Sequence, residues 1–221
     1  QSGFQNSNDT GGPTGQYNYL GNLGSPRMSR IFFDRGEESQ FIFTDPLDFS
    51  ILTPDEVTFM NTYSPYTNLT YHKSFNNRNS EERFKSYYAV NANSKLGFGF
   101  FVDYIYGRGM YNNQSTAMFN TGLFSSYLGD KYNMHFIFSY DNQKLRENGG
   151  ITDDRYITDP LSMAEGKKQY SSTDIPTMLN KVWNHNTSIH TFLTHRYNLG
   201  FKKKKKDSIE TDSLNIVQEF V

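Results

Sequence analysis

Residues 96–106, Leu-Gly-Phe-Gly-Phe-Phe-Val-Asp-Tyr-Ile-Tyr, decide the fold. Every second side chain from Leu96 to Tyr106 is large and apolar or aromatic, whereas the alternate positions include Gly97, Gly99 and Asp103. A period of two is typical of a β-strand, whose successive side chains point to opposite faces. The stretch exceeds the usual strand of about 5–6 residues and matches the roughly 9–11 residues of a strand that crosses a membrane.

The same alternation recurs elsewhere in the chain. It is clear at 132–141 and 189–201, and weaker at 66–75, 83–91 and 116–128. Tyrosines such as Tyr132 and Tyr140 begin or end the apolar face, as in the aromatic girdles of membrane barrels. A β-sandwich with an aromatic core also explains the alternation, but its strands are usually shorter. We therefore predict an all-β fold, an antiparallel transmembrane β-barrel of which this chain is an N-terminal portion of six to seven strands, with the seventh starting within 213–221.

The composition narrows the class of protein further. The 221 residues include 19 Phe, 16 Tyr and 1 Trp but no Cys, and their mean hydropathy is −0.72. So many rings exclude a disordered or collagen-like chain, and no run approaches the roughly 20 apolar residues of a membrane-spanning helix. A net charge of −1 gives no reason to expect nucleic acid as a partner. The lack of cysteine excludes disulfide frameworks and thiol nucleophiles.

The chain divides into three regions. Residues 1–19 are mostly Gly, Asn, Ser and Gln, and we predict a flexible N-terminal segment there. Residues 20–64 carry short apolar patches broken by prolines, and we predict a periplasmic or plug-like segment. Residues 65–221 are predicted to hold the N-terminal strands of the barrel.

The connections between the predicted strands alternate in length, as periplasmic turns and external loops do in outer-membrane barrels. We assign 92–95, 129–131 and 202–212 to the periplasmic side, and 76–82, 107–115 and 142–188 to the outside. Every second connection is the longer one until 202–212, which is of middling length. The external loop 142–188 is too long for a plain hairpin, and within it Thr177–Trp183 follows Pro176 with the pattern of a short capped helix. Six strands would leave two edges unpaired in lipid, so we expect either a longer barrel or completion by another chain.

If the apolar faces contact lipid, the opposite faces line the interior of the barrel. The candidate lumen-facing residues are Arg83, Lys85, Lys95, Asp103, His135, Asp141, His190 and Arg196. Their mixed charges would either set an electric field for passing solutes or fill a closed interior with salt bridges, and the sequence leaves both open.

The sequence gives no support for a catalytic site or a metal site. His185, His190 and His195 are spaced by five, and an odd spacing on a strand places neighbours on opposite faces, with His195 toward lipid and His185 before the strand. The acidic residues within 153–159 lack the regular spacing of a calcium loop. There is no nucleophile elbow. We predict no catalytic residue, no cofactor and no metal.

Two further motifs have structural interpretations. Lys202–Lys206 follows the last clear strand, and we interpret it as a solvated periplasmic turn beside lipid headgroups. Gly97-Phe98-Gly99 and Gly107-Arg108-Gly109 complete no phosphate-binding pattern. Within strands, these glycines are predicted to allow curvature or the close approach of a plug.

Three segments resemble the family of putative porins of Bacteroidetes outer membranes. They are Leu20-Gly21-Asn22-Leu23-Gly24-Ser25-Pro26 with Ile31-Phe32-Phe33, then Phe59-Met60-Asn61-Thr62-Tyr63-Ser64-Pro65-Tyr66-Thr67-Asn68-Leu69, and finally His195-Arg196-Tyr197-Asn198-Leu199-Gly200-Phe201 after a loop containing Asp174-Ile175-Pro176. The resemblance implies an outer-membrane β-barrel made with a signal peptide, with the family's C-terminal strands absent here. It implies no catalytic residues.

These observations lead to a functional expectation with alternatives. The first expectation is a passive channel for small solutes in the bacterial outer membrane. The alternative is a non-conducting structural or accessory barrel within a larger outer-membrane complex, and a third hypothesis is a secreted β-sandwich that binds glycan. The expected partners of a barrel are outer-membrane lipid and other outer-membrane proteins or lipoproteins.

Overall fold

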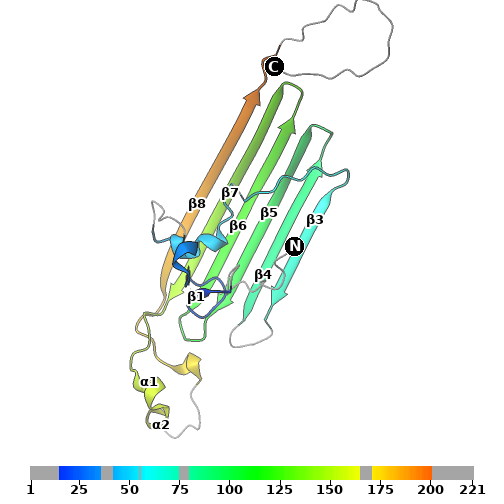
Figure 1. Cartoon of the computed structure of the whole chain (residues 1–221). Helices are drawn as coiled ribbons and strands as arrows, with labels where there is room; N and C mark the ends of the chain where they lie inside the picture. The colour runs from blue at the N-terminus through cyan, green and yellow to red at the C-terminus, as the bar shows by residue number, and fades with distance from the viewer. Residues whose placement is uncertain (1–14, 36–41, 55, 75–79, 165–170, 201–221) are drawn as a thin grey trace, which may run out of the picture.

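The computed structural model describes residues 15–35, 42–54, 56–74, 80–164 and 171–200. Their main body is a six-stranded antiparallel sheet whose strands follow one another in chain order, as Figure 1 shows. The strands are β3 (Tyr66–Lys73), β4 (Glu81–Asn91), β5 (Leu96–Arg108), β6 (Ser115–Leu128), β7 (Tyr132–Glu147) and β8 (Val182–Tyr197). The sheet is open, with β3 and β8 at its edges. The prediction of an all-β antiparallel fold is confirmed, and no helix among the described residues is long and apolar enough to cross a membrane.

The two faces of the sheet differ in burial. One face, the covered face, carries the odd-numbered residues of β4, β5 and β7 and the even-numbered residues of β3, β6 and β8, as the pairing register requires. Phe101, Ile105, Met118, Phe124 and Ile137 on this face are all less than 5% exposed. The opposite face, the open face, carries the remaining strand residues. The sheet therefore has a packed side and a bare side.

A segment near the N-terminus covers the packed side. Residues 20–35, 42–54 and 56–61, together the covering segment, contain β2 (Arg27–Ser29), η2 (Phe32–Asp34) and η3 (Asp45–Ser50), and cross in front of the sheet in Figure 1. Its apolar side chains form two clusters with the strands. The first contains Leu23, Leu47, Ile105, Met118 and Leu145, and the second contains Val57, Ala89, Phe101, Phe124 and Ile137.

Polar side chains of the sheet form hydrogen bonds with the irregular covering segment. Pro26, Pro46 and Pro54 interrupt it, so it forms no long element that could pair its own backbone groups. The amide of Asn120 donates to the carbonyl of Ser50 at 3.2 Å, and that of Gln143 donates to the Ser50 hydroxyl at 2.8 Å. Because buried backbone groups need such partners, the polar residues of the covered face fix where the segment lies.

The structure describes only the last residues of the first predicted region. Residues 1–14 lie outside the described residues, but β1 (Tyr17–Tyr19) pairs with β2 in a small two-stranded sheet. The guanidinium of Arg27 lies 4.6 Å from the centre of the Tyr17 ring and 4.1 Å from that of Phe49. This cation–π stacking joins β1 to η3. The flexibility of residues 1–19 stays a prediction.

The loop between β7 and β8 is shorter than the predicted 142–188. Both strands continue beyond their apolar stretches, so the connection is 148–181. The predicted helix at 177–183 is wrong, because Val182 and Trp183 belong to β8 and pair with Glu147 and Arg146. The short helices of the loop are instead α1 (Arg155–Thr158), α2 (Pro160–Met163) and η4 (Ser172–Asp174). The predicted strand at 213–221 and the lysines at 202–206 lie outside the described residues.

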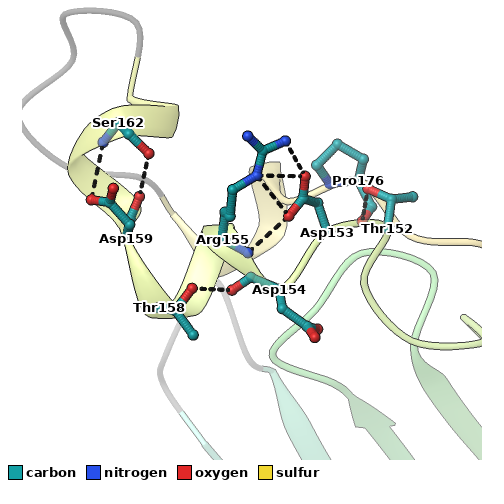
Figure 2. A network of polar contacts seen from close by, with 8 residues as sticks. All are labelled: Thr152, Asp153, Asp154, Arg155, Thr158, Asp159, Ser162 and Pro176. Carbon is teal, nitrogen blue, oxygen red and sulfur yellow. Dashed lines mark hydrogen bonds and ion pairs between the residues drawn. The ribbon is translucent and has the colours of Figure 1, made fainter.

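Figure 2 shows the polar network that holds this loop. The backbone N–H of Thr152 donates to the carbonyl of Pro176 at 3.1 Å and joins the two arms of the loop. The guanidinium Nε of Arg155 donates to both oxygens of Asp153, at 3.1 and 2.9 Å. The carboxylate of Asp159 accepts from the N–H of Ser162 at 3.4 Å and caps α2, whose first residue is Pro160.

The Asp153–Arg155 contact is expected to make the loop acid-sensitive. Hydrogen bonds from the side chain and backbone of Arg155 hold the pKa of Asp153 below its ordinary value. A carboxylate with a lowered pKa contributes stability above the ordinary value, near 3.9, and loses it as the pH falls through the folded pKa. Because the intrinsic rate of amide exchange itself changes with pH, the comparison uses protection factors, the intrinsic rate divided by the measured rate at the same pH. The protection factors of the amides at residues 153–156, measured by NMR, should therefore be lower at pH 3 than at pH 6.

Two variants make this a matched test. Asp153→Asn should give low protection factors at both pH values, because the ion pair is gone. Asp154→Asn should behave as the unmodified chain does, because the Asp154 side chain points away from the network in Figure 2. Equal protection factors at both pH values in the unmodified chain would contradict the prediction.

Candidate functional site

The middle of the open face carries no Lys, Arg, Asp or Glu. This holds for the described strands over the rows that pair with β5 between Leu96 and Tyr104. The large side chains of these rows that are at least 36% exposed are Leu69, Tyr71, Phe84, Phe98, Phe100, Phe119, Leu123, Phe138, Ile189 and Leu193. Nine strand residues extend about 27 Å, or about 21 Å at the usual tilt of barrel strands, close to the roughly 25 Å apolar band of such barrels. An uncharged, exposed band of this height is suited to acyl chains.

Aromatic residues border this band at both ends. At the end with short turns, the ring centres of Tyr127 and Tyr132 are 6.1 Å apart, and the rings of Tyr132 and His195 are 6.2 Å apart. At the end with long loops, Tyr106 and Trp183 lie on the same open face. Amphipathic rings at both borders are the pattern of membrane–water interfaces.

Seven of the eight candidate lumen-facing residues lie together on the covered face. The register places Arg83, Lys85, Asp103, His135, Asp141, His190 and Arg196 there. The eighth, Lys95, lies in the turn between β4 and β5 rather than on a strand. Its ammonium donates to Asp130 at 3.0 Å, and this hydrogen bond raises the pKa of Lys95 above its ordinary value. The charged candidates on the strands are thus separated from the uncharged band by the thickness of the sheet.

The covered face brings three of the candidates into one ion cluster. Arg83 donates to Asp103 through two bonds, from Nε to Oδ1 at 3.1 Å and from Nη2 to Oδ2 at 2.7 Å. The ammonium of Lys85 lies 3.8 Å from the same carboxylate. The Arg83 side chain is 11% exposed, whereas that of Lys85 is 47% exposed. Arg83 and Asp103 therefore form a partly buried ion pair, whereas Lys85, which contacts the same carboxylate, is more exposed.

Removing the carboxylate of this cluster should weaken the folded state. Asp103→Asn is expected to cost about 1–2 kcal/mol, because it leaves the mostly buried Arg83 without its anionic partner, and the partial exposure limits the loss. Denaturant unfolding in detergent micelles measures it. The double variant with Arg83→Gln should recover part of the loss, and strict additivity of the two changes would contradict a direct pairing.

A second contact between titratable side chains lies deeper. His190 and Asp141 approach to 3.8 Å, and the Asp141 side chain is 3% exposed. Neither oxygen of Asp141 has a hydrogen-bond partner among the described residues. The pair lies beside Asn120 and Ser139 on the covered face, since Asn120 pairs with Asp141 and Ser139 with His190.

The remaining two candidates differ in their surroundings. The ring of His135 meets Phe59 of the covering segment edge-on, with centroids 5.0 Å apart. Arg196 is exposed near the end of β8. Among the other histidines, His190 and His195 lie on opposite faces, as predicted, but His185 lies within β8, not before it, and contacts Asn142 at 2.9 Å. The described residues contain no group of three or more acidic or histidine side chains suited to a metal ion.

The sequence did not indicate which residues anchor the covering segment. The amide of Asn22 donates to the hydroxyl of Thr116 at 3.1 Å, and Thr116 donates to the carbonyl of Leu23 at 2.5 Å. The N–H of Leu23 donates to Glu81 at 2.8 Å. Gly107 lies against the Leu23 carbonyl, where a Cβ would overlap it. The one signal in the sequence was the glycine in this strand, whose predicted role in the close approach of a plug-like segment agrees with this contact.

Comparisons with known proteins agree with this geometry. A comparison with family models matches residues 1–220 to the family described as "Putative porin". Comparisons with curated proteins and with solved structures find no match. The family match covers nearly the whole chain, including the segments whose resemblance the sequence indicated, and this family implies a porin-like protein of the bacterial outer membrane. The chain belongs to the putative porin family.

Proposed function

We propose that the protein is a passive channel of the outer membrane for small polar solutes, with a lumen on the covered side of the sheet. The observation that carries the proposal is the opposite polarity of the two faces. The open face has an uncharged band of membrane height, and the covered face holds the charged candidates. A barrel with lipid outside and water inside requires this separation.

The covering segment narrows the proposed lumen. It fills the space over β5, β6 and β7, where Leu23, Leu47 and Val57 contact the strands. Toward the two edges the covered face is less buried, and Lys85 and Arg196 are exposed there. Solutes would therefore pass beside the covering segment, along walls that carry positive charge.

Single-channel recording of the full-length protein in planar bilayers tests the proposal. We expect discrete openings, and Lys85→Glu should shift the reversal potential toward cation selectivity because it inverts an exposed charge of the lumen. Lys144→Glu on the open face is the matched control and should leave selectivity unchanged. Reproducible absence of openings with well-inserted protein would reject the channel.

The second candidate is a non-conducting structural barrel within a larger complex. The tight packing of the covering segment favours it, because Asn22, Thr116 and Leu23 form a continuous hydrogen-bonded seam. This candidate predicts no openings for the native protein and co-purification with other outer-membrane proteins. Isolation as a conducting protein without partners would reject it.

A further inference from the structure

The open face carries its arginine and lysine residues at one end only. In the described strands, Lys73, Arg108, Lys144 and Arg146 all lie on this face beside the long loops. The rows at the short-turn end carry tyrosines and His195 but no lysine or arginine on this face. The only carboxylate on the open face of these strands is Glu82, which pairs with Lys73 at 3.8 Å. The positive charge at the long-loop end is thus largely uncompensated.

Three of these cations surround one place on the sheet. Ser115 of β6 pairs with Arg108 on one side and with Arg146 on the other, and Ala117 pairs with Lys144. Strands are about 4.8 Å apart, so Arg108 and Arg146 stand about 10 Å from each other with only a small side chain between them. We call Arg108, Lys144 and Arg146 the basic patch. A tetrahedral anion could approach Ser115 and contact cations on both sides.

Trp183 supports the basic patch from β8. The ammonium of Lys144 lies 4.4 Å from the centre of the indole, and the guanidinium of Arg146 lies 5.6 Å from it. Arg146 also donates to the amide oxygen of Asn113 at 2.5 Å. These contacts hold two long side chains at the border of the uncharged band, so less side-chain entropy is lost when an anion binds.

We propose that the basic patch binds the phosphate of a lipid headgroup in the leaflet on the long-loop side. The patch lies directly beyond the uncharged band and on the same face, which is where a phosphate attached to membrane-embedded acyl chains would lie. In bacterial outer-membrane barrels the longer loops are external, so the ligand is a phosphorylated glycolipid of the outer leaflet. Arginine forks are suited to phosphate oxygens, and the tryptophan is suited to the interfacial region.

The proposal rests on the membrane placement in the proposed function, and the experiment separates the two. The full-length protein is first floated with vesicles of neutral phosphatidylcholine, which reports insertion without any anionic lipid. Failure to float would reject the membrane placement itself. If the protein floats, its binding to the lipid headgroup can be tested separately from its insertion into the membrane.

The binding probe is an acylated glucosamine disaccharide with two phosphates, compared with its dephosphorylated form in detergent micelles. Binding is followed by the fluorescence of Trp183, taken as the difference between the protein and its Trp183→Phe variant. We expect the phosphorylated probe to bind at least about tenfold more tightly, with an affinity that falls as salt rises. Equal affinity for the two probes would overturn the proposal.

Matched double variants locate the site. The double variant Arg108→Gln/Lys144→Gln should remove the preference for the phosphorylated probe. It leaves the hydrogen bond between Arg146 and Asn113 in place. The control double variant Lys95→Gln/Lys131→Gln removes two positive charges at the short-turn end instead. It should keep the preference for the phosphorylated probe. An unchanged preference in the first pair would reject the basic patch. Displacement of the probe by millimolar inorganic phosphate would assign the patch to free phosphate and reject the lipid.

Discussion

Leu123→Arg is expected to destabilise the protein in a lipid bilayer by about 2–4 kcal/mol, the cost of an arginine at mid-depth on the lipid face of a barrel. Leu123 lies on β6 near the middle of the uncharged band, and its side chain is 58% exposed. In a water-soluble β-sandwich, the same change at so exposed a position would alter stability by only about 0.5 kcal/mol. The substitution therefore distinguishes lipid from water as the neighbour of this face.

Ala117→Arg provides the matched control for depth. Ala117 lies on the same strand and face but in the row of Lys144, at the edge of the band. Its substitution should cost about 0–1 kcal/mol, because the guanidinium reaches the headgroups. Reversible unfolding of the full-length protein from lipid vesicles measures both variants. Equal small costs for the two would contradict a lipid-facing band and favour the glycan-binding sandwich.

Gly107→Ala is expected to cost about 2–3 kcal/mol, near the upper end of the usual range for overpacking. A Cβ at this position would overlap the carbonyl oxygen of Leu23 and press on the hydroxyl of Thr116. The backbone of Leu23 cannot rotate away as a flexible side chain would, so the covering segment must shift and its bonds to Thr116 must lengthen. The loss should appear as faster amide exchange at residues 20–26, while exchange in β7 stays slow.

Gly200→Ala is the control for this prediction. A Cβ there meets nothing within 4 Å, so the substitution should leave both stability and exchange unchanged. If Gly107→Ala also left exchange at residues 20–26 unchanged, the close contact with Leu23 would not be what holds the covering segment. Channel recordings of the same variant would show whether the displaced segment changes the conductance.

The strands could be predicted from the sequence because the side chains of the open face and those of the covered face alternate. Phe98, Phe100 and Val102 on one face oppose Phe101 and Asp103 on the other, and this contrast is enough to assign each residue of β5 to its face. The candidate residues followed from the same alternation, which is why seven of the eight share a face. Lys95 was misplaced because the alternation of residue types continues past the end of the strand, whereas the backbone turns there.

The alternation of apolar and polar residues ends near the edge of the uncharged band. Beyond Asp141 the open face of β7 carries Asn142, Lys144 and Arg146, so alternation of apolar and polar residues no longer marks the strand, although backbone pairing with β8 continues. The helical pattern at 177–183 misled for a related reason. Trp183 serves as a cross-strand partner of Arg146, and tertiary pairing overrides a short helical propensity.

The position of the covering segment could not be predicted, because its contacts are distant in sequence. Asn22 meets Thr116 across 94 positions, and Gln143 meets Ser50 across 93. No periodic pattern encodes such contacts, since each depends on one polar side chain facing one particular partner group. The proline-broken composition of residues 20–64 did indicate that they would not form regular strands.

These long-range contacts have a consequence for the order of assembly. Residues 20–61 are synthesised before the sheet, yet the surface that Asn22, Leu23 and Leu47 require exists only after β5, β6 and β7 have paired. Closing loops of this length is slow compared with forming neighbouring hairpins. Until then, Leu47 and Val57 remain in contact with solvent and are prone to aggregation. The covering segment precedes the strands in the sequence and is therefore the last of these parts to acquire its native neighbours.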